Sequence, residues 1–379
     1  MNLTQFANSV LTIGATNTIL AQGEPGIGKS SVLKMLKKQL SDTHNISYID
    51  CAQLDLGDFA LPFVVSIDDA DSTNNTKNDT HAKKVTRFAP NARFRAHEGK
   101  PVVVMLDELG KAARPVQNVL LTLLLEHRIG DVVLPEGSIV FATTNLSSDG
   151  VGDKIEAHAR NRMVIVNIDK PTVEQWCEWA LYADVAPEIL AFVEAFPQVL
   201  ASYTTLAAGE KNPYIFDPRT TGNNAFVTPR SLEAASNIVK QRATLGTHVT
   251  TELLSGCVGR SAAADMATFI SFGDQMPQWT TIMQAPDKAP VPESPIVRTM
   301  LVRNAVQRVS QGDVSSVDLA EKKREMDQWM KYLERLEPEL VALFCLSIGK
   351  APMLLAKPWI GSNRAYIEVM SRNAWTFTR

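Results

Sequence analysis

Apolar and polar positions follow different patterns in the two parts of the chain, before and after Pro171. Up to about residue 170, short apolar runs without polar alternation are separated by amphipathic stretches. Such runs are typical of strands buried on both faces of a parallel sheet, and the amphipathic stretches are typical of crossover helices. The pattern therefore predicts an α/β unit. Its strands are predicted at residues 18–21, 46–51, 102–106, 139–142 and 164–168.

Helical periodicity alone follows Pro171, and no strand is predicted there. Thr172 and Gln175 have the spacing of a capping box, which predicts a helix that begins at residue 173 and helical structure to about residue 200. Residues 285–295 contain four prolines, which a helix interior does not accept, so this segment is either a linker or an extended strap. Further helices are predicted near residues 228–242, 249–272, 298–309, 315–336 and 363–372.

A polar and basic insert, at about residues 57–100, interrupts the first pattern. Residues 68–82 lack hydrophobic periodicity, which predicts an exposed loop. Residues 83–100 carry six cations against the single acid Glu98. These cations favour contact with nucleic acid phosphates, and the alternatives are a solvated loop or a contact with another subunit. They are Lys83, Lys84, Arg87, Arg93, Arg95 and Lys100.

Composition narrows the class of protein. Of the 379 residues, 45% are hydrophobic and 21% are charged, which excludes disordered and coiled-coil classes. The 38 basic and 41 acidic residues give a net charge of −3, so the overall charge does not indicate nucleic acid or an anionic membrane as a partner. The longest apolar runs are far shorter than a membrane helix, and the first residues lack a signal peptide pattern, which predicts no membrane association and a cytoplasmic protein. The four dispersed cysteines predict neither a disulfide framework nor a zinc site.

Residues 23–30 fit the pattern G-x-x-x-x-G-K-[ST] between a predicted strand and a predicted helix. The glycines permit a tight loop whose backbone N–H groups surround phosphate oxygens at a helix N-terminus. Lys29 would reach the β- and γ-phosphates, and Ser30 would bind Mg²⁺. The pattern predicts ATP and Mg²⁺ as ligands. The predicted nucleotide-binding residues are Gly23, Glu24, Pro25, Gly26, Ile27, Gly28, Lys29, Ser30 and Ser31.

Two further strands end in polar side chains. The run 102–106 leads to Asp107, which would complete the Mg²⁺ site, and to Glu108, which would polarise the attacking water. The run 139–142 ends near Asn145, whose neutral amide both donates and accepts and therefore suits the positioning of a water molecule. Together with the phosphate loop, these residues predict an enzyme that hydrolyses ATP to ADP and phosphate.

At this point the chain resembles the AAA+ ATPases. The phosphate loop, the acidic strand end and the asparagine occur in family order over residues 18–145. The resemblance implies a parallel five-stranded sheet with helices on both faces, followed by an α-helical lid. It also implies an arginine finger, supplied to a neighbouring subunit by Arg162 or Arg160, and a sensor arginine at Arg230 in Thr228-Pro229-Arg230.

The resemblance is strongest to the MoxR-like, dynein-related branch. It is carried by residues 50–55, by residues 121–145 with a hairpin-like segment, and by Phe216-Asp217-Pro218. It implies a homo-oligomer, either a hexameric ring or a helical assembly, that remodels a protein client. A von Willebrand A-type partner would be a separate chain, because the nearest metal-binding string, 313–317, is incomplete.

The alternative function is a nucleic-acid-binding AAA+ module that uses ATP as an assembly switch. The predicted domains are a nucleotide-binding core (1–170), a lid (171–284), a Pro-rich linker (285–297) and a C-terminal helical region (298–379).

Overall fold

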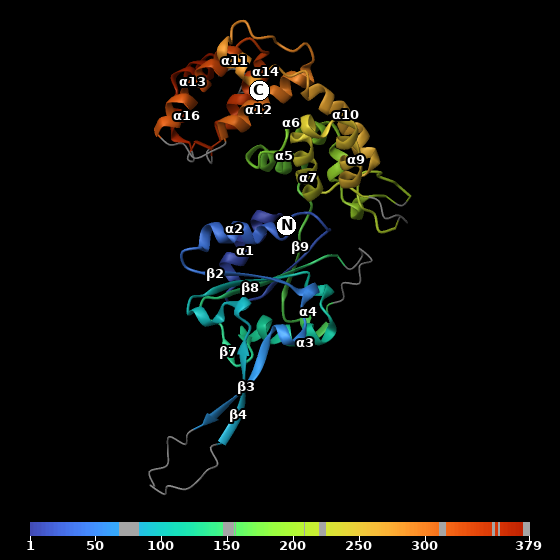
Figure 1. The fold of residues 1–379 in the computed structure, drawn as a ribbon, viewed down its shortest axis with the longest axis vertical. Coiled ribbons are helices and arrows are strands. Elements are labelled where there is room, and N and C mark those ends of the chain that lie inside the picture. Colours follow the sequence, from blue (N-terminus) through green and yellow to red (C-terminus); the bar gives the residue numbers. More distant parts are fainter. Residues whose placement is uncertain are drawn as a thin grey trace. The chain divides into compact units, whose positions relative to one another are not determined.

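The computed structural model divides the chain into two compact units (Figure 1). The first unit comprises Met1–Lys170 with Asp217–Thr220, and the second comprises Pro171–Phe216 with Thr221–Arg379. The predicted exposed loop 68–82 lies outside the described residues, as does most of the string 313–317. The structure describes residues 1–67, 83–146, 155, 157–207, 209–219, 225–310, 316–350, 353–354 and 357–373.

The first unit is built around a parallel sheet whose five strands confirm the five predicted ones. In the described residues the strand order is β2-β5-β8-β1-β9. The order reverses beside β1, and in open α/β sheets ligands bind at such a switch point, outside the carboxyl ends of the strands. The strands are β1 (Ile19–Gln22), β2 (Asn45–Asp50), β5 (Val102–Asp107), β8 (Ile139–Thr144) and β9 (Val164–Asn167).

Helices cover both faces of this sheet. On one face, Val103 packs in a cluster with Phe6 of α1 and Leu36 of α2. On the other face, Val104 packs in a cluster with Leu120 of α3. Every residue of β5 and β8 is buried, as expected for strands between two helical layers. The helices are α1 (Leu3–Ile13), α2 (Ser31–Leu40), α3 (Arg114–Glu126) and α4 (Ala157–Arg160), with the 3₁₀ turns η1 (Cys51–Gln53), η2 (Leu56–Asp58), η3 (Ala92–Phe94), η4 (Ala96–Glu98) and η5 (Leu109–Lys111).

The insert contains an antiparallel hairpin of β3 (Ala60–Ile67) and β4 (Lys83–Pro90), which the sequence pattern did not predict. Its two strands project away from the sheet (Figure 1). Both faces of this ribbon carry exposed side chains, so the sequence lacks the alternation that marks a half-buried strand.

A second, short hairpin of β6 (Arg128–Ile129) and β7 (Val132–Val133) confirms the hairpin expected ahead of the fourth sheet strand. Its turn anchors the base of the longer hairpin, because Phe88 N donates to Asp131 Oδ2 at 2.7 Å. Gly130 in this turn has φ 56°, and a Cβ there would lie 2.6 Å from the Phe88 carbonyl oxygen. Glycine is therefore required at this contact between the two hairpins.

The described residues of the second unit form helices joined by loops and turns, without a strand. The predicted helix 249–272 is in fact two helices that meet at Gly259, where φ is 87° and a Cβ would clash with the Ala225 carbonyl oxygen. Helix α14 was not predicted, because it is apolar on most of its surface and has no regular polar stripe. The elements are α5 (Val173–Tyr182), α6 (Pro187–Ala195), η7 (Pro197–Leu200), η8 (Tyr203–Thr205), α7 (Pro229–Lys240), α8 (Arg242–Leu245), α9 (Thr247–Val258), α10 (Arg260–Gly273), α11 (Trp279–Gln284), α12 (Pro295–Ser310), α13 (Ser316–Leu333), α14 (Pro338–Ile348), α16 (Pro358–Gly361) and α17 (Arg364–Arg372).

One hydrophobic core runs through this unit from Trp176 of α5 to Val369 of α17. The proline-rich segment before α12 begins with a turn at residues 286–288, and hydrogen bonds hold it on this core. Tyr332 donates its hydroxyl to the Pro290 carbonyl oxygen at 2.7 Å, and Arg335 donates to that of Ala289 at 2.8 Å. The division of this unit into a lid and a separate C-terminal region stays a prediction.

No helix in the described part of the chain is long and apolar enough to span a membrane. All four cysteines are free thiols, and Cys51, Cys177 and Cys345 are buried.

Candidate active site

The loop between β1 and α2 has the backbone geometry that phosphate binding requires. Gly26 and Gly28 have φ values of 73° and 97°, in the region that favours glycine. A Cβ at Gly23 would lie 2.8 Å from the Ile168 carbonyl oxygen, so a side chain there would also push the loop away from the end of β9. The loop is therefore fixed against the sheet and ends at the N-terminus of α2, where backbone N–H groups bind anions.

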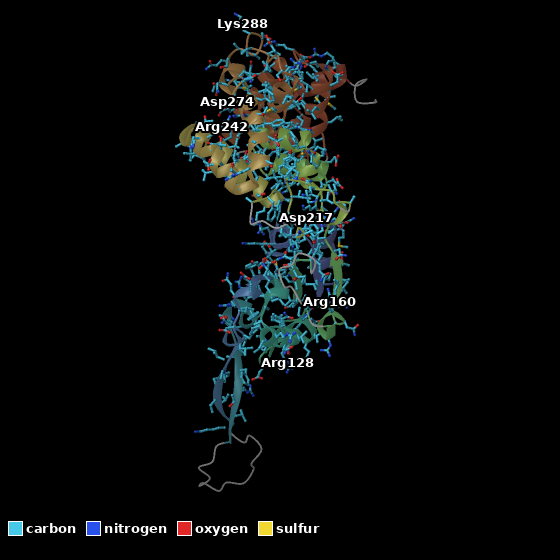
Figure 2. The ribbon with its side chains drawn as sticks, turned by 90° about the vertical axis from the view of Figure 1, so that its right-hand side faces the viewer. Arg128, Arg160, Asp217, Arg242, Asp274 and Lys288 are labelled. Atoms are coloured by element: carbon cyan, nitrogen blue, oxygen red, sulfur yellow. The ribbon has the colours of Figure 1, made fainter. Side chains whose placement is uncertain are left out.

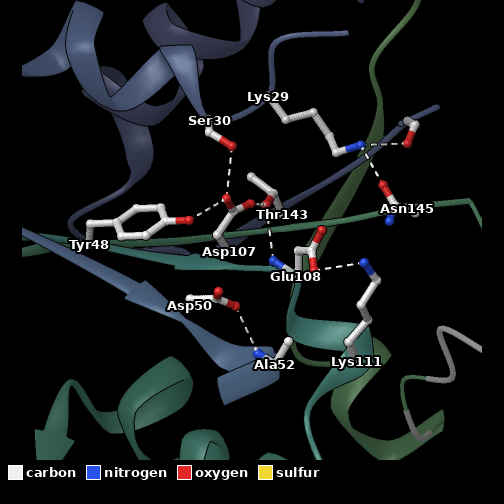
Figure 3. Close-up of polar contacts among 11 residues, drawn as sticks. Lys29, Ser30, Tyr48, Asp50, Ala52, Asp107, Glu108, Lys111, Thr143 and Asn145 are labelled. Atoms are coloured by element: carbon white, nitrogen blue, oxygen red, sulfur yellow. Dashed lines mark hydrogen bonds and ion pairs between the residues drawn. The ribbon is translucent and has the colours of Figure 1, made fainter. Parts of the chain in front are cut away.

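The Lys29 side chain closes this loop (Figure 3). Its ammonium nitrogen donates to the carbonyl oxygens of Gly23 and Glu24, at 2.6 and 2.9 Å, and to Asn145 Oδ1 at 3.0 Å. Lys29 is only 9% exposed. A buried cation thus connects the phosphate loop with the residue that follows β8.

Asp107, the last residue of β5, accepts three hydrogen bonds (Figure 3). Ser30 Oγ and the Tyr48 hydroxyl donate to its Oδ2, at 2.8 and 2.9 Å, and Thr143 Oγ1 donates to its Oδ1. The bond from Ser30 places a hydroxyl and a carboxylate oxygen side by side. Mg²⁺ at nucleotide sites is bound by one or two such oxygens and by substrate phosphates, so Ser30 and Asp107 fit the role of Mg²⁺ ligands.

Glu108 has an unusual backbone conformation, with φ 55° and ψ 40°. This left-handed conformation is strained for a residue with a side chain and is typical of functional sites. The Glu108 carboxylate forms an ion pair with Lys111 at 2.7 Å, whereas that of Asp107 contacts Ser30 (Figure 3). The kink after β5 therefore gives the two adjacent carboxylates different partners.

Acidic groups dominate the electrostatics of this edge. Asp50 ends β2 directly opposite Asp107 in the sheet register. Burial, reinforced by Asp107 and Asp50, raises the pKa of the Cys51 thiol well above its usual range. Partial burial of the Tyr48 hydroxyl and the neighbouring Asp107 also raise its pKa. Both groups therefore stay protonated at neutral pH.

Four residues of this site were not predicted from the sequence. Tyr48 and Thr143 hold Asp107, and Lys111 pairs with Glu108. Lys170 forms a buried ion pair with Glu24 of the phosphate loop at 2.9 Å. No motif marks these residues, although the register that puts β2 and β8 beside β5 would have indicated the first two.

The two candidate finger arginines lie at the amino ends of the sheet strands, opposite the phosphate loop at the carboxyl ends. Arg160 ends α4, and Arg162 precedes β9 by two residues; both are exposed (Figure 2 labels Arg160). The first residue of β9, Val164, pairs with Ile19 at the start of β1. Four residues of β1 then lead to the phosphate loop, which is about 13 Å of strand. Neither arginine joins the group formed by Lys29, Ser30, Asp107, Glu108 and Asn145.

The remaining predicted residues have the following places. Arg230 is exposed in the first turn of α7 in the second unit, between the capping-box residues Thr228 and Ser231. In the basic stretch, Arg93 pairs with Asp58 at 3.2 Å and Arg95 pairs with Glu98 at 2.8 Å.

The sheet topology, the phosphate loop and the acidic end of β5 define a P-loop nucleoside triphosphatase with the AAA+ architecture. Residues 18–144 match the family model described as "AAA domain (dynein-related subfamily)". Over these residues the chain is similar to the AAA domains of that subfamily, and the protein is an ATPase.

Solved structures with some similarity to this chain include the following two. The RuvB Holliday junction branch migration motor of Thermotoga maritima is 12% identical, with a TM-score of 0.36 over 86% of this chain and 80% of that chain. NtrX from Brucella abortus in complex with ADP is 13% identical, with a TM-score of 0.34 over 98% of this chain and 68% of that chain. A comparison with curated proteins gives no significant match.

Proposed function

We propose that this chain is a MoxR-like AAA+ ATPase that hydrolyses Mg-ATP within a homo-oligomer and uses the cycle to remodel a protein client. One observation carries the proposal. The phosphate loop lies at the carboxyl edge of the sheet, whereas Arg160 and Arg162 are exposed at the amino edge. An arginine so placed suits a phosphate held by a neighbouring subunit, in a hexameric ring or a helical assembly.

Phosphoryl transfer needs an oriented water and positive charge near the γ-phosphate. Glu108 would polarise the water and Asn145 would help to position it. Lys29 would exchange its bonds to loop carbonyls and Asn145 for bonds to phosphate oxygens. Mg²⁺ bound by Ser30 and Asp107 would neutralise charge on the phosphates. Arg162 would complete the site of the neighbour, and Arg230 would contact the nucleotide from the second unit.

The hairpin of β3 and β4 supports a protein client. Leu61 and Val64 are 63% and 65% exposed, and Phe63 and Phe88 are also exposed. Both faces of the projecting ribbon therefore offer apolar side chains, which suit contact with protein rather than with phosphates. A separate von Willebrand A-type partner is one such client or adaptor.

The alternative function, nucleic acid binding, finds less support. Two of the six cations in residues 83–100, Arg93 and Arg95, already pair with carboxylates. These pairs leave fewer charges for a polynucleotide backbone, whose binding depends on many cations. A gel-shift titration across salt concentrations tests this alternative directly.

Mixing two inactive variants tests the shared site. Arg162→Ala lacks the finger but keeps its own carboxylates, whereas Glu108→Gln lacks the carboxylate but keeps its finger. Each variant alone should be nearly inactive, because a trans arginine contributes about 10³-fold or more to turnover. In mixed assemblies, some interfaces combine an intact Glu108 with a neighbour's intact Arg162. Steady-state phosphate release by the mixture should therefore exceed the sum of the two variants.

The same mixture with Arg160→Ala in place of Arg162→Ala identifies the finger, because only the variant that lacks it is inactive alone and rescued in the mixture. Arg162→Lys is a matched variant that keeps the charge but lacks the planar fork, and should stay slow. Formation of mixed assemblies is checked by native mass measurement with two differently tagged chains. Mixed assemblies without rescue by either arginine variant would exclude a site shared in this way.

A further inference from the structure

The phosphate loop contains a carboxylate that the phosphate-binding pattern does not require. Glu24, the second residue of the loop, forms an ion pair with Lys170 at 2.9 Å, and the two side chains are only 6% and 5% exposed. Burial of an isolated charge is strongly unfavourable, so each of these charges depends on compensation by its surroundings. The ion pair is therefore an integral part of the folded loop.

The pair changes the electrostatics of phosphate binding. A buried carboxylate in the loop repels the phosphates of ATP, and charges that are partly shielded from water interact over several ångströms. Lys170 cancels this repulsion from a position outside the phosphate-binding pattern. Loss of the lysine charge would leave an anion in the loop, whereas loss of the Glu24 charge would leave a cation beside it.

Lys170 also occupies a special place in the chain. It is the last residue of the first unit before Pro171, and Thr172 then caps α5, the first helix of the second unit. The segment that leads to Lys170 follows the loop closely. Ile168 N donates to the Gln22 carbonyl oxygen at 2.7 Å, and the Ile168 carbonyl oxygen packs against Gly23. A shift of the phosphate loop would therefore act on the segment that enters the second unit.

We propose that Lys170 is the counter-cation of the phosphate loop: it neutralises Glu24 for nucleotide binding and makes the segment that enters α5 respond to the nucleotide. Lys170 acts by its charge beside the loop, which offsets that of Glu24, and this role needs no contact with the nucleotide. The inference rests on nucleotide binding at the loop and not on client remodelling or the trans arginine.

Calorimetric ATP titration of the full chain tests the charge effect with Lys170→Met, Glu24→Gln and the double variant. Lys170→Met should raise the Kd for ATP about tenfold, whereas Glu24→Gln should lower it. The double variant should return to within about threefold of wild type. A purely structural ion pair would behave differently. Both single variants would lower the Tm, and their ATP affinities would not shift in opposite directions.

Controls keep this test decisive. Lys38→Met removes an exposed cation of α2 and should leave the Kd within twofold. Lys170→Arg keeps the charge and should bind ATP like wild type. If Lys170→Met does not fold, the double variant is compared with Glu24→Gln alone, and it should bind ATP more weakly. Equal affinities in that comparison, or shifts of both single variants in one direction, would overturn the counter-cation role.

Hydrogen exchange tests the link to α5. Saturating ATP should slow exchange of amides in residues 167–182 of the wild-type protein. In the double variant, ATP still binds but this protection should fall by at least half. Equal protection in both proteins would show that the segment does not respond through Lys170.

Discussion

The carboxyl and amino edges of the five-stranded sheet hold the candidate catalytic residues in two different states. At the carboxyl edge, Lys29 and Asp107 are buried and hydrogen-bonded to residues from other strands and loops. At the amino edge, Arg160 and Arg162 extend from a short helix and the turn after it and are exposed. Groups that act within one chain are thus already assembled, while the candidate groups for a neighbouring chain remain at the surface. Under the proposed function, assembly rather than folding would complete the site.

The largest expected effect concerns the carboxyl edge. Glu108→Gln should retain ATP binding but lower the turnover number about 10²-fold or more, because the carboxylate that polarises the water is lost while Lys29 and Asp107 remain. Phosphate release and ATP titration measure the two quantities. Glu136→Gln, an exposed carboxylate of the same unit, is the control and should be fully active. Phosphate release within threefold of wild type would remove Glu108 from the mechanism.

Lys29→Ala tests nucleotide binding within a single chain, apart from assembly with other chains. Loss of a cation that would bond to the β- and γ-phosphates should raise the Kd for ATP roughly 10- to 100-fold. Arg162→Ala, at the amino edge, should leave the Kd of unassembled chains within about threefold. Equilibrium titration at protein concentrations below assembly compares them. Equal losses of affinity would contradict the distinction between the two edges.

Thr143→Val tests whether the carboxyl edge is held together by its buried bonds. The substitution preserves shape but leaves Asp107 Oδ1 and the Glu108 backbone N–H without the hydroxyl that contacts both. Such unsatisfied groups cost about 1–3 kcal/mol. A denaturant titration that follows unfolding of the first unit should therefore show a lower free energy of unfolding. If the denaturant concentration at the midpoint of unfolding and the slope of the transition were both unchanged, this bond would not stabilise the fold.

The smallest effect is expected at Tyr48, which is half exposed and orients Asp107 through one hydrogen bond. Tyr48→Phe should raise the Mg²⁺ concentration required for half-maximal ATP binding about fivefold, because one partly exposed hydrogen bond contributes about 1 kcal/mol. Tyr182→Phe, in the second unit, is the matched control. A changed ATP affinity at saturating Mg²⁺ would place Tyr48 in direct contact with the nucleotide instead.

Different parts of the fold were predictable to different degrees. The five sheet strands were found because each is a continuous apolar run between helical patterns, as in Val102–Asp107. The β3–β4 hairpin was missed because its exposed Leu61 and Val64 give no alternation of buried and exposed positions. The break between α9 and α10 was missed because periodicity continues across Gly259, although its positive φ ends the first helix.

The sequence by itself determined the phosphate loop, the acidic end of β5 and Asn145, because backbone geometry and phosphate chemistry restrict which residues can occupy consecutive positions. Only the tertiary structure decided which distant residues join them. Tyr48, Thr143 and Lys170 are 59, 36 and 146 positions from the groups that they contact, Asp107 for the first two and Glu24 for the third. Sheet register and burial create these contacts, and neither leaves a local pattern in the chain. The same register puts the phosphate loop and the exposed arginines at opposite edges of one sheet.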